Sequence, residues 1–544
     1  MHQWPTVAMG LGHHKLAFAN PRSSVEVHSF HLPQRDHQSY YHDRGGDDEA
    51  ARRPMGMSPF EDLSLTSSQS RSFFRRIESS RFLQVFLRYP APDSIRLKPT
   101  SWLDGVRGVA ALEVYIFHTI SCWRTLFPAY NSTPDERSIL QLPGIRTFFT
   151  TGGAAVCVFF ALSGYVLTYK SLQWMRAGSN HLVYPSVASS MFRRGFRLYL
   201  PPICLTFFEM LATRVGYSPP LNFDFTPESN LFAQVWDWLK ETWYLVNPYY
   251  TFPRAIQGFI VHPKYDAVIW TIPIEFYGSF TVYLLLLLLA RVPSSAARMV
   301  LVALFAALSM FLGAWNAFCF SSGMLIADYN LAQEEEEAEG LEEELELEEV
   351  GFSLRPTRYR HPRLCAGVFV LAMYITGFPT LSSPGVHEAP MPGFEGLHAM
   401  IPWSLNMEDH ARWWWSLSGV AVLFCISQLA ALKSLFETYF CQYLGKIAFS
   451  LYLMHQFCII LFGLFLQNSL LAIFGVATHS MTWAYWALCL LWYVPFTLLT
   501  FALAAQVERY VDAGSVKLAR WLEGKCLDVY RDLLARRKGM YRPL

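Results

Sequence analysis

Residues 101–120, SWLDGVRGVAALEVYIFHTI, decide the fold of this chain because they form an apolar run that carries ionisable side chains. The run is as long as the roughly 20 residues that a helix needs to cross a hydrocarbon core of about 30 Å. Ionisable side chains are costly inside a membrane, so each one marks a candidate functional position. The stretch therefore predicts both a transmembrane helix and part of a site.

The spacing within this stretch places its charged residues on related faces of one helix. Arg107 and His118 are 11 residues apart, which is three turns plus about 20° and a separation of about 16 Å along the axis. Asp104 lies one turn before Arg107 and could pair with it, while Gly105 and Gly108 would let another helix approach closely. Two interpretations fit: a polar stripe joining an anion-binding cation to a proton-accepting imidazole, or an interfacial arginine and a structural histidine.

The whole chain of 544 residues has the composition of a membrane protein. It is 52% hydrophobic and 16% charged, whereas soluble proteins are about 25% charged. Ten apolar runs of suitable length are predicted to span the membrane: 102–121, 148–169, 197–216, 268–290, 298–315, 317–329, 364–382, 412–432, 447–467 and 484–506. The sixth is short enough to be re-entrant, and the fifth and sixth could be one broken helix.

The predicted fold is an all-α membrane protein, a bundle of about ten transmembrane helices with a disordered N-terminal tail. Residues 1–95 form the tail because they are too polar to fold alone, and residues 96–510 form the ten-helix domain. Residues 333–350, QEEEEAEGLEEELELEEV, are interpreted as an acidic cytosolic insertion, and residues 511–544 as a basic C-terminal segment. Lys and Arg gather in the loops on the side of the tail, which predicts that both termini are cytosolic. The sequence does not indicate which membrane holds the protein.

Further candidate residues lie in or beside later apolar runs. Arg193 and Arg197, in MFRRGFRLYLPP, are spaced i and i+4 and form either a phosphate clamp or an ordinary positive flank. Glu275, in AVIWTIPIEFYGSF, follows a proline that could open a cavity by kinking the helix. Ser163, in FFALSGYVL, could line a site or pack helices, and His455 could be a site residue or a buried hydrogen-bonding group.

Several kinds of site are not predicted. The ten cysteines form no CxxC pair, the candidate residues lack the spacing of metal ligands, and no nucleophile elbow is present. No basic stripe of the kind that binds nucleic acid occurs along the chain.

These segments together resemble, in the same order, those of the acyltransferase-3 family of integral membrane O-acyltransferases, and in particular its fungal members. Arg107 and His118 match the R-x(10)-H signature of the family's opening helix, and Arg193 and Arg197 match its R-x-x-x-R motif. VFFALSGYVLT, WTIPIEFY, SSGMLIAD and LGKIAFSLYLMH are similar to later family segments, so the resemblance covers about residues 100–508. Phe449 stands where the family often has Tyr.

The resemblance implies transfer of an acyl group, with acetyl as the expected group, from acyl-CoA to a hydroxyl of a carbohydrate, lipid or secondary metabolite. Acyl-CoA is then a co-substrate, and no bound cofactor or metal is predicted. The resemblance implies that His118 acts in catalysis, and we predict that it is the general base. Glu275 is predicted as a second catalytic residue, and either Glu275 or Asp104 could orient His118 or hold an arginine. The partners implied are membrane lipid and the hydroxyl acceptor, without nucleic acid. An acyl-enzyme intermediate stays open.

The remaining candidate residues are assigned to binding. The resemblance implies that Arg107, Arg193 and Arg197 bind the acyl-CoA donor or position the acyl group, and we predict that Ser163 and His455 contact the substrate. The alternative function is a membrane transporter or flippase of a small polar or anionic solute, because such a protein also carries a polar stripe through a helical bundle.

Overall fold

The structure is a computed structural model that describes residues 97–540 except 125, 135, 220–224, 350–360, 382–389, 406, 479 and 481. The side chains of residues 341–349 and 536–540 are also outside this description. The described residues form helices and no strand, so the prediction of an all-α protein is confirmed. The predicted tail, residues 1–95, lies outside the described residues.

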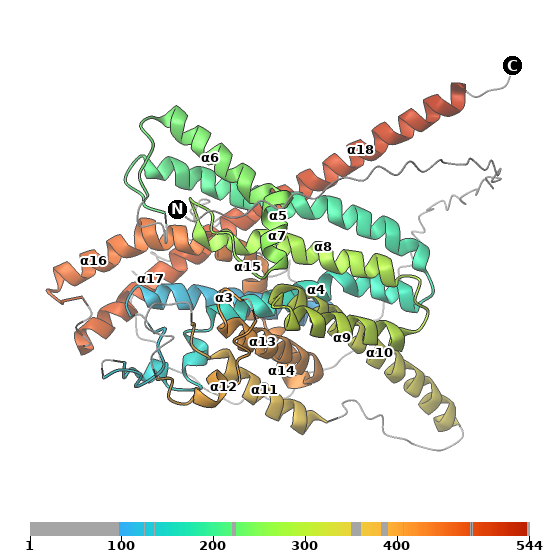
Figure 1. Cartoon of the computed structure of the whole chain (residues 1–544), viewed down its shortest axis with the longest axis horizontal. Helices are drawn as coiled ribbons and strands as arrows, with labels where there is room; N and C mark the ends of the chain where they lie inside the picture. Colours follow the sequence, from blue (N-terminus) through green and yellow to red (C-terminus); the bar gives the residue numbers. More distant parts are fainter. Residues whose placement is uncertain are drawn as a thin grey trace, which may run out of the picture. The chain divides into compact units, whose positions relative to one another are not determined.

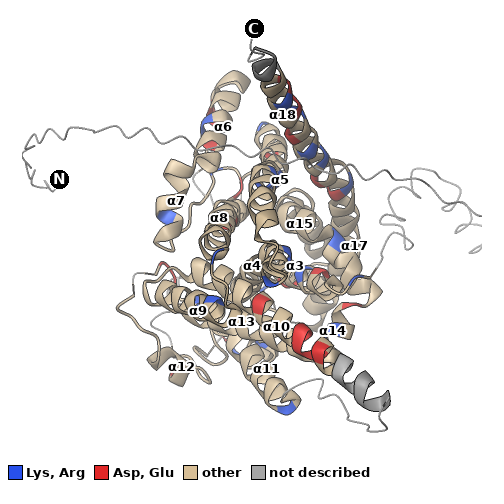
Figure 2. Ribbon diagram, turned by 90° about the vertical axis from the view of Figure 1, so that its right-hand side faces the viewer, with Lys and Arg blue, Asp and Glu red and all other residues tan. Residues whose placement is uncertain are grey.

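Long helices make up most of the described chain. They are α3 (Ser101–Ser121), α4 (Gly152–Arg176), α5 (Val183–Thr213), α8 (Thr271–Leu289), α9 (Ser295–Phe311), α10 (Trp315–Glu349), α11 (Pro362–Thr376), α13 (Ala411–Gln428), α15 (Tyr439–Cys458), α17 (Trp483–Val507) and α18 (Ala513–Met540). The shorter α-helices are α6 (Leu231–Val246), α7 (Pro248–Ile256), α12 (Glu395–Ala399), α14 (Ala430–Phe436) and α16 (Leu464–Ile473). Many of them run along one common direction (Figure 1) and are seen nearly end-on in Figure 2, with α3 and α4 in the middle.

Several of these helices are long and apolar enough to cross a membrane. Four helical segments meet both conditions, Gly152–Arg176, Ala267–Leu289, Tyr439–Ile473 and Trp483–Ala535, and α13 with α14 make a fifth if this pair, bent by 100°, is one span. Helices α9 and α11 are apolar but shorter. The described part of the chain thus has four or five candidate spans, and each of the ten predicted ranges overlaps a helix.

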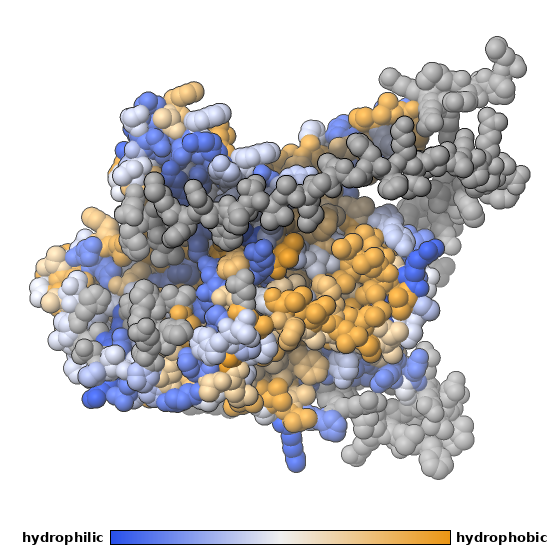
Figure 3. Space-filling model, viewed as in Figure 1, coloured by the Kyte–Doolittle hydropathy of each residue, from blue (hydrophilic) through white to orange (hydrophobic). Residues whose placement is uncertain are grey.

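The outer surface of the bundle is apolar where lipid would cover it. Helices α8 and α9 expose five leucines, Leu284, Leu288, Leu301, Leu304 and Leu308. Figure 3 shows the resulting hydrophobic patch on this face. Figure 2 shows charged residues along α18 and at the end of α10. Large exposed apolar surfaces mark binding to membranes or partners, so this distribution indicates a membrane protein.

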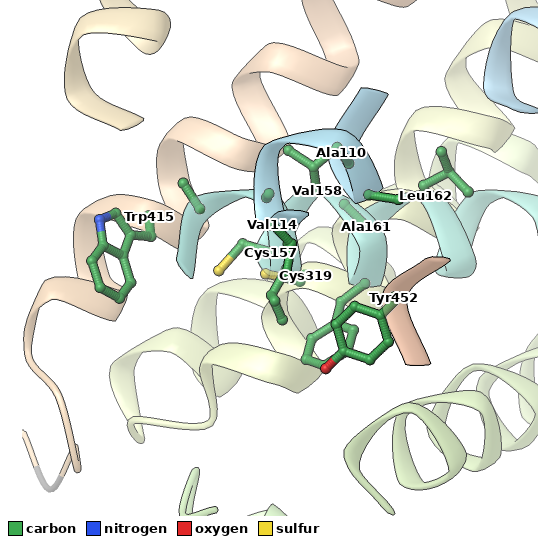
Figure 4. Packing of buried hydrophobic residues seen from close by; sticks show 14 of the residues in the cluster. Ala110, Val114, Cys157, Val158, Ala161, Leu162, Cys319, Trp415 and Tyr452 are labelled. Atoms are coloured by element: carbon green, nitrogen blue, oxygen red, sulfur yellow. The ribbon is translucent and has the colours of Figure 1, made fainter. Parts of the chain in front are cut away.

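Small residues bring the central helices into close contact. A Cβ atom added at Gly323 of α10 would lie 1.8 Å from the carbonyl oxygen of Ala161 in α4, and one at Gly108 of α3 would lie 2.3 Å from the backbone nitrogen of Gly445 in α15. Figure 4 shows how α3, α4 and α10 converge around Val114, whose neighbours are mostly small. Glycine therefore sets the spacing of the helices, as the sequence of α3 predicts.

Some helix boundaries differ from those predicted. Helix α5 begins at Val183 rather than at residue 197, so its arginines lie in the middle of a helix. The fifth and sixth spans are separate helices, joined at Gly313 with φ of 80°. Helix α10 continues through the acidic run as far as Glu349, because glutamate favours helix. The basic C-terminal segment is also helical, and a π-helical turn over Glu508–Asp512 joins α18 to α17.

Helix α6 turns its apolar side away from the rest of the protein. Phe232 and Trp243 are exposed, whereas Asp237 is buried beneath them. Lys264 and Tyr265 donate hydrogen bonds to Asp237 at 2.6 and 2.8 Å. Burial alone would raise the pKa of Asp237, but these bonds outweigh it and hold that pKa below its usual range. The helix thus exposes aromatic residues on one face, while the polar residue on its opposite face is buried and hydrogen-bonded. A helix that lies at a membrane interface has this arrangement.

The contact between α4 and α10 generates a stability prediction. Gly323→Ala should lower the melting temperature in detergent because its Cβ would collide with a backbone carbonyl, and overpacking costs about 1–3 kcal/mol. Gly367→Ala in α11 is the matched control, since nothing lies within 4 Å of the added atom. Thermal denaturation followed by size-exclusion chromatography measures both, and equal melting temperatures would contradict the close packing of these helices.

Candidate active site

Two histidines from different helices meet in the centre of the bundle. The Nδ1 atom of His118 in α3 lies 3.2 Å from Nε2 of His455 in α15, and their ring centroids are 4.9 Å apart. Each histidine also has its Nδ1 beside the carbonyl oxygen four residues earlier in its own helix: Val114 at 2.9 Å for His118, and Leu451 at 3.2 Å for His455. His455 is fully buried, so these contacts hold it in place.

The carbonyl oxygens decide which nitrogen of each ring carries the proton. A carbonyl can only accept, so the hydrogen-bond network assigns the proton of each neutral ring to Nδ1. The Nε2 atom of His455 then accepts a hydrogen bond from Nδ1–H of His118. The same N–H is also directed to the carbonyl oxygen of Val114, so the two acceptors share one proton. The Nε2 atom of His118 therefore keeps its lone pair and makes no hydrogen bond to a described residue. This is the atom that can accept a proton.

Arg107 is fixed between helices at the other end of the stripe. Its Nη2 atom lies 2.9 Å from the carboxylate of Asp104, as their spacing predicts, and donates to the carbonyl oxygen of Gly445 at 2.9 Å. This second bond spans 338 positions of the chain and joins α3 to α15. The same pair of helices thus carries Arg107 and both histidines.

A cavity of about 130 Å³ lies next to Arg107. Helices α3, α4, α5, α8 and α15 provide its walls, which include several of the polar residues that the sequence singles out. Its lining consists of Arg107, Val156, Phe159, Phe160, Ser163, Arg194, Arg197, Leu198, Thr271, Ile272, Glu275, Phe449 and Tyr452. Three arginines and one glutamate face a space that is otherwise largely aromatic and aliphatic, which suits an anion attached to an apolar chain.

Glu275 is bound to an arginine rather than to His118. It forms a close ion pair with Arg194, and Ser163 donates a hydrogen bond to the same carboxylate oxygen at 2.6 Å. The Nε atom of Arg194 also donates to Ser279 at 2.9 Å. Of the two roles predicted for Glu275, the structure thus shows it holding an arginine, and His455 occupies the place beside His118.

The two arginines of the predicted clamp point to different places. Arg197 lines the cavity with an exposed side chain, and no ion pair joins it to a described residue. Arg193 is not among the lining residues and instead lies 3.4 Å from Glu523 of α18. Arg194 takes the place expected of Arg193. Arg194 and Arg197 are three positions apart, and residues at i and i+3 share a helix face as do those at i and i+4. The spacing in the sequence could therefore have indicated that Arg194 lies beside Arg197, but nothing in it indicated that Arg193 pairs with Glu523.

A row of aromatic rings connects the cavity to the histidines. Phe159 and Tyr452 line the cavity with centroids 6.3 Å apart, and Tyr452 is 6.0 Å from His455. Tyr452 is held by Thr271 at 2.8 Å and by the carbonyl oxygen of Val268. Sequence reasoning did not single out Tyr452, although it lies one turn before His455.

This arrangement combines an unprotonated imidazole nitrogen with arginines that can hold an anionic group. Both features are compatible with group transfer inside a membrane protein. Comparisons with known proteins give the class. The sequence model described as an acyltransferase domain matches residues 100–505. The chain belongs to the acyltransferase-3 family and is an acyl-transferring enzyme, which decides against the transporter alternative.

Three fungal relatives agree with this assignment. The chain is 30% identical to O-acetyltransferase PaAT-1 of Phomopsis amygdali over 446 residues, covering 78% of this chain and 84% of the relative. It is 23% identical to acyltransferase R4 of a Phoma species, over 67% and 83% of the two chains. It is 25% identical to acyltransferase clz18 of Cochliobolus lunatus, over 69% and 85%. No solved structure matches the chain.

The histidine pair generates a prediction for His455. His455→Leu should lower kcat by about ten- to a hundredfold, because a hydrogen bond to a charged group contributes about 1.5–3 kcal/mol and 1.36 kcal/mol is tenfold in rate. His455→Gln, which can restore an acceptor, should recover part of the loss. Steady-state kinetics with purified protein measure both, and the KM for the donor should stay near that of the wild type. Equal losses in the two variants would indicate a packing role only.

Proposed function

We propose that the protein transfers an acyl group, with acetyl as the simplest case, from acyl-CoA to a hydroxyl group of its acceptor. The observation that carries the proposal is the Nε2 atom of His118, which makes no hydrogen bond to a described residue and belongs to a histidine pair that Tyr452 connects to the arginine-lined cavity. A neutral imidazole with an unprotonated ring nitrogen suits removal of a proton from a hydroxyl. The relative from Phomopsis amygdali is an O-acetyltransferase, which supports acetyl transfer to oxygen.

The proposed reaction needs one base and no covalent enzyme intermediate. The Nε2 atom of His118 removes the proton of the acceptor hydroxyl while the oxygen attacks the thioester carbonyl carbon. The carbon–sulfur bond then breaks, and the CoA thiolate leaves and takes from Nε2 the proton that came from the acceptor hydroxyl. During the step His118 is cationic, and its Nδ1 proton is shared between Val114 and His455. General base catalysis contributes about 10²–10⁴-fold, and the remainder would come from positioning.

The arginines of the cavity would bind the donor. Arg107 and Arg194 are already neutralised by Asp104 and Glu275, which leaves Arg197 as the cation best placed for a phosphate. Guanidinium groups bind phosphate through two parallel hydrogen bonds. Because about 130 Å³ is too small for a whole CoA molecule, the cavity would hold the acyl-bearing arm, which leads along Tyr452 toward the histidines.

The proposed topology has ten membrane crossings with both termini in the cytosol. Its support is that every predicted range overlaps a helix. In addition, the acidic end of α10 and the C-terminal helix α18 extend beyond the bundle on the same side (Figure 1). The donor would enter from that side, and the acceptor is proposed to be a small molecule, lipid or glycan that carries a hydroxyl.

The first experiment measures CoA release from acetyl-CoA by membranes that contain the wild type or His118→Ala, with a panel of hydroxylated acceptors. We expect release to require an acceptor and to fall about 10²–10⁴-fold in the variant. Release that is unaffected by His118→Ala would remove this residue as the base. Trp483→Ala, which changes an exposed residue that does not line the cavity, controls for expression and insertion.

The two clamp arginines provide a matched pair for donor binding. Arg197→Ala should raise the KM for acyl-CoA by about ten- to a hundredfold, since charge-assisted hydrogen bonds contribute about 1.5–3 kcal/mol each. Arg193→Ala should leave that KM close to the wild-type value, because its side chain pairs with Glu523 outside the cavity. Steady-state kinetics with varied acyl-CoA distinguish the two, and the reverse pattern would contradict the proposed donor site.

A further inference from the structure

A second cavity lies on another side of α3. It has a volume of about 120 Å³ and is enclosed by α3, α4, α11, α13 and α14 together with the short 3-10 turn at Arg146–Phe148. Its lining consists of Val106, Val109, Ala110, Glu113, Thr147, Thr151, Ala154, Ala155, Val158, Phe369, Met373, Thr376, Val422, Ile426 and Phe436. The wall is aliphatic and aromatic except for three threonines and one glutamate.

This cavity is separate from the one beside Arg107. No lining residue is common to the two. Glu113 follows Arg107 by six positions, which places the two side chains about 120° apart around α3. Figure 4 shows Ala110 and Val158, two residues of the second cavity, well away from Tyr452, which lines the first. The second cavity is therefore outside the proposed donor site.

Glu113 is the one carboxylate in this lining, and its hydrogen bonding is incomplete. Thr151 approaches its Oε2 atom at 3.3 Å, but the same hydroxyl also donates to the carbonyl oxygen of Thr147 at 2.9 Å. One hydroxyl proton cannot fully serve both acceptors. The other carboxylate oxygen makes no hydrogen bond to a described residue, and no described cation forms an ion pair with Glu113.

The other two threonines of the lining do not donate hydrogen bonds to Glu113. Thr147 and Thr376 both donate to the carbonyl oxygen of Met373, at 2.6 and 2.7 Å. Their protons are therefore committed to the backbone. An acidic side chain at the wall of an apolar cavity, whose one hydrogen-bond partner among the described residues is a shared hydroxyl, is incompletely satisfied and therefore costly, and such residues within membrane proteins mark binding or transport positions.

The chemistry of the cavity selects a ligand with a hydroxyl group. A hydroxyl can donate to a carboxylate and can also accept from a protonated carboxyl, so it satisfies Glu113 in either state. An ammonium group would match only the carboxylate, and it would lose more hydration on entering an apolar space. The aliphatic and aromatic wall would surround the hydrocarbon next to that hydroxyl.

We propose that this cavity binds the hydroxyl-bearing end of a lipophilic molecule, with Glu113 as its hydrogen-bond partner. Helix α11 offers a route to the membrane, because Phe369 and Met373 face the cavity while Val370 and Leu371 are exposed. Two sources share this chemistry: the acceptor of the proposed transfer, and a hydroxylated membrane lipid. Occupancy of the cavity can be tested without any acyl transfer, so it stands or falls independently of the proposed function.

Photolabelling of the full-length protein in lipid nanodiscs tests occupancy directly. The probe is a long-chain alcohol that carries a diazirine near its hydroxyl and a terminal alkyne, and labelled peptides are identified by mass spectrometry. We expect labels on α3, α4 and α11, competition by unlabelled alcohol, and weak competition by an alkane of equal length. Glu113→Leu should reduce this labelling by about tenfold, while Glu113→Gln, which keeps a hydrogen-bonding group, should retain most of it.

A second variant guards against misfolding of the first. Phe369→Trp enlarges a wall residue on the partly exposed α11 and should also reduce labelling, with a melting temperature and elution profile like those of the wild type. Labelling that is unchanged in both Glu113→Leu and Phe369→Trp, or that spreads evenly over the membrane helices, would overturn the proposal.

Two further measurements separate the sources. If the acceptor occupies the cavity, Glu113→Leu should raise the KM for the acceptor about tenfold and leave the KM for acyl-CoA unchanged. If a membrane lipid occupies it, kinetics should stay the same while a hydroxylated lipid that copurifies with the wild type is lost from the variant. If neither the acceptor KM nor the lipid content changes, neither molecule occupies the cavity and the proposal fails.

Discussion

The close contact between α3 and α15 is the constraint on which the site depends. Gly108 and Gly445 let the two backbones approach so closely that a single methyl group could not be placed between them. That distance allows Arg107 to reach the carbonyl oxygen of Gly445, and it brings His118 and His455 within hydrogen-bonding distance. Arg107 and the two histidines are thus held by one helix pair, and an increase in its spacing would disturb both ends together.

Several arginines inside the bundle are neutralised by carboxylate partners. Arg107 and Arg194 each have a carboxylate partner, and so does the buried Arg298, which binds Asp328 at 2.9 Å. Buried charges are tolerated when they are paired and hydrogen-bonded. Other buried charges are satisfied without an ion pair, as Arg146 is by the carbonyl oxygens of Phe127 and Pro128. Arg197 and Glu113 form no ion pair with a described residue and each lines a cavity, so a ligand could supply the partner of each.

The sequence predicted the class of fold and much of the site because both depend on local patterns. Apolar runs placed the helices, and the spacing of Arg107 and His118 placed a polar stripe along α3. Asp104 could be assigned to Arg107 because the pair is one turn apart. The boundaries of α5 and α10 were missed because charged residues can continue a helix beyond an apolar run, which hydropathy alone does not register.

Contacts between distant parts of the chain could not be predicted. The position of Arg193 depends on Glu523, which is 330 residues later in the chain, and the role of Arg194 depends on Glu275. His455 was an open choice between a site residue and a buried hydrogen-bonding group, and its place beside His118 depends on how α15 packs. Glu113 was not predicted as a site residue, because its proposed role depends on a cavity that forms only when distant helices pack together.

The backbone carbonyls that orient the two histidines have an evolutionary consequence. In many enzymes a carboxylate side chain fixes the tautomer of a catalytic histidine, and a single base change in the gene can destroy it. Here the oxygens belong to the main chain at Val114 and Leu451, and every amino acid supplies the same oxygen. Although both side chains are packed in the core, a substitution that preserves the packing and the helix at either position would leave the tautomer unchanged. Residue-by-residue comparison of relatives would overlook them, although the chemistry at His118 depends on both.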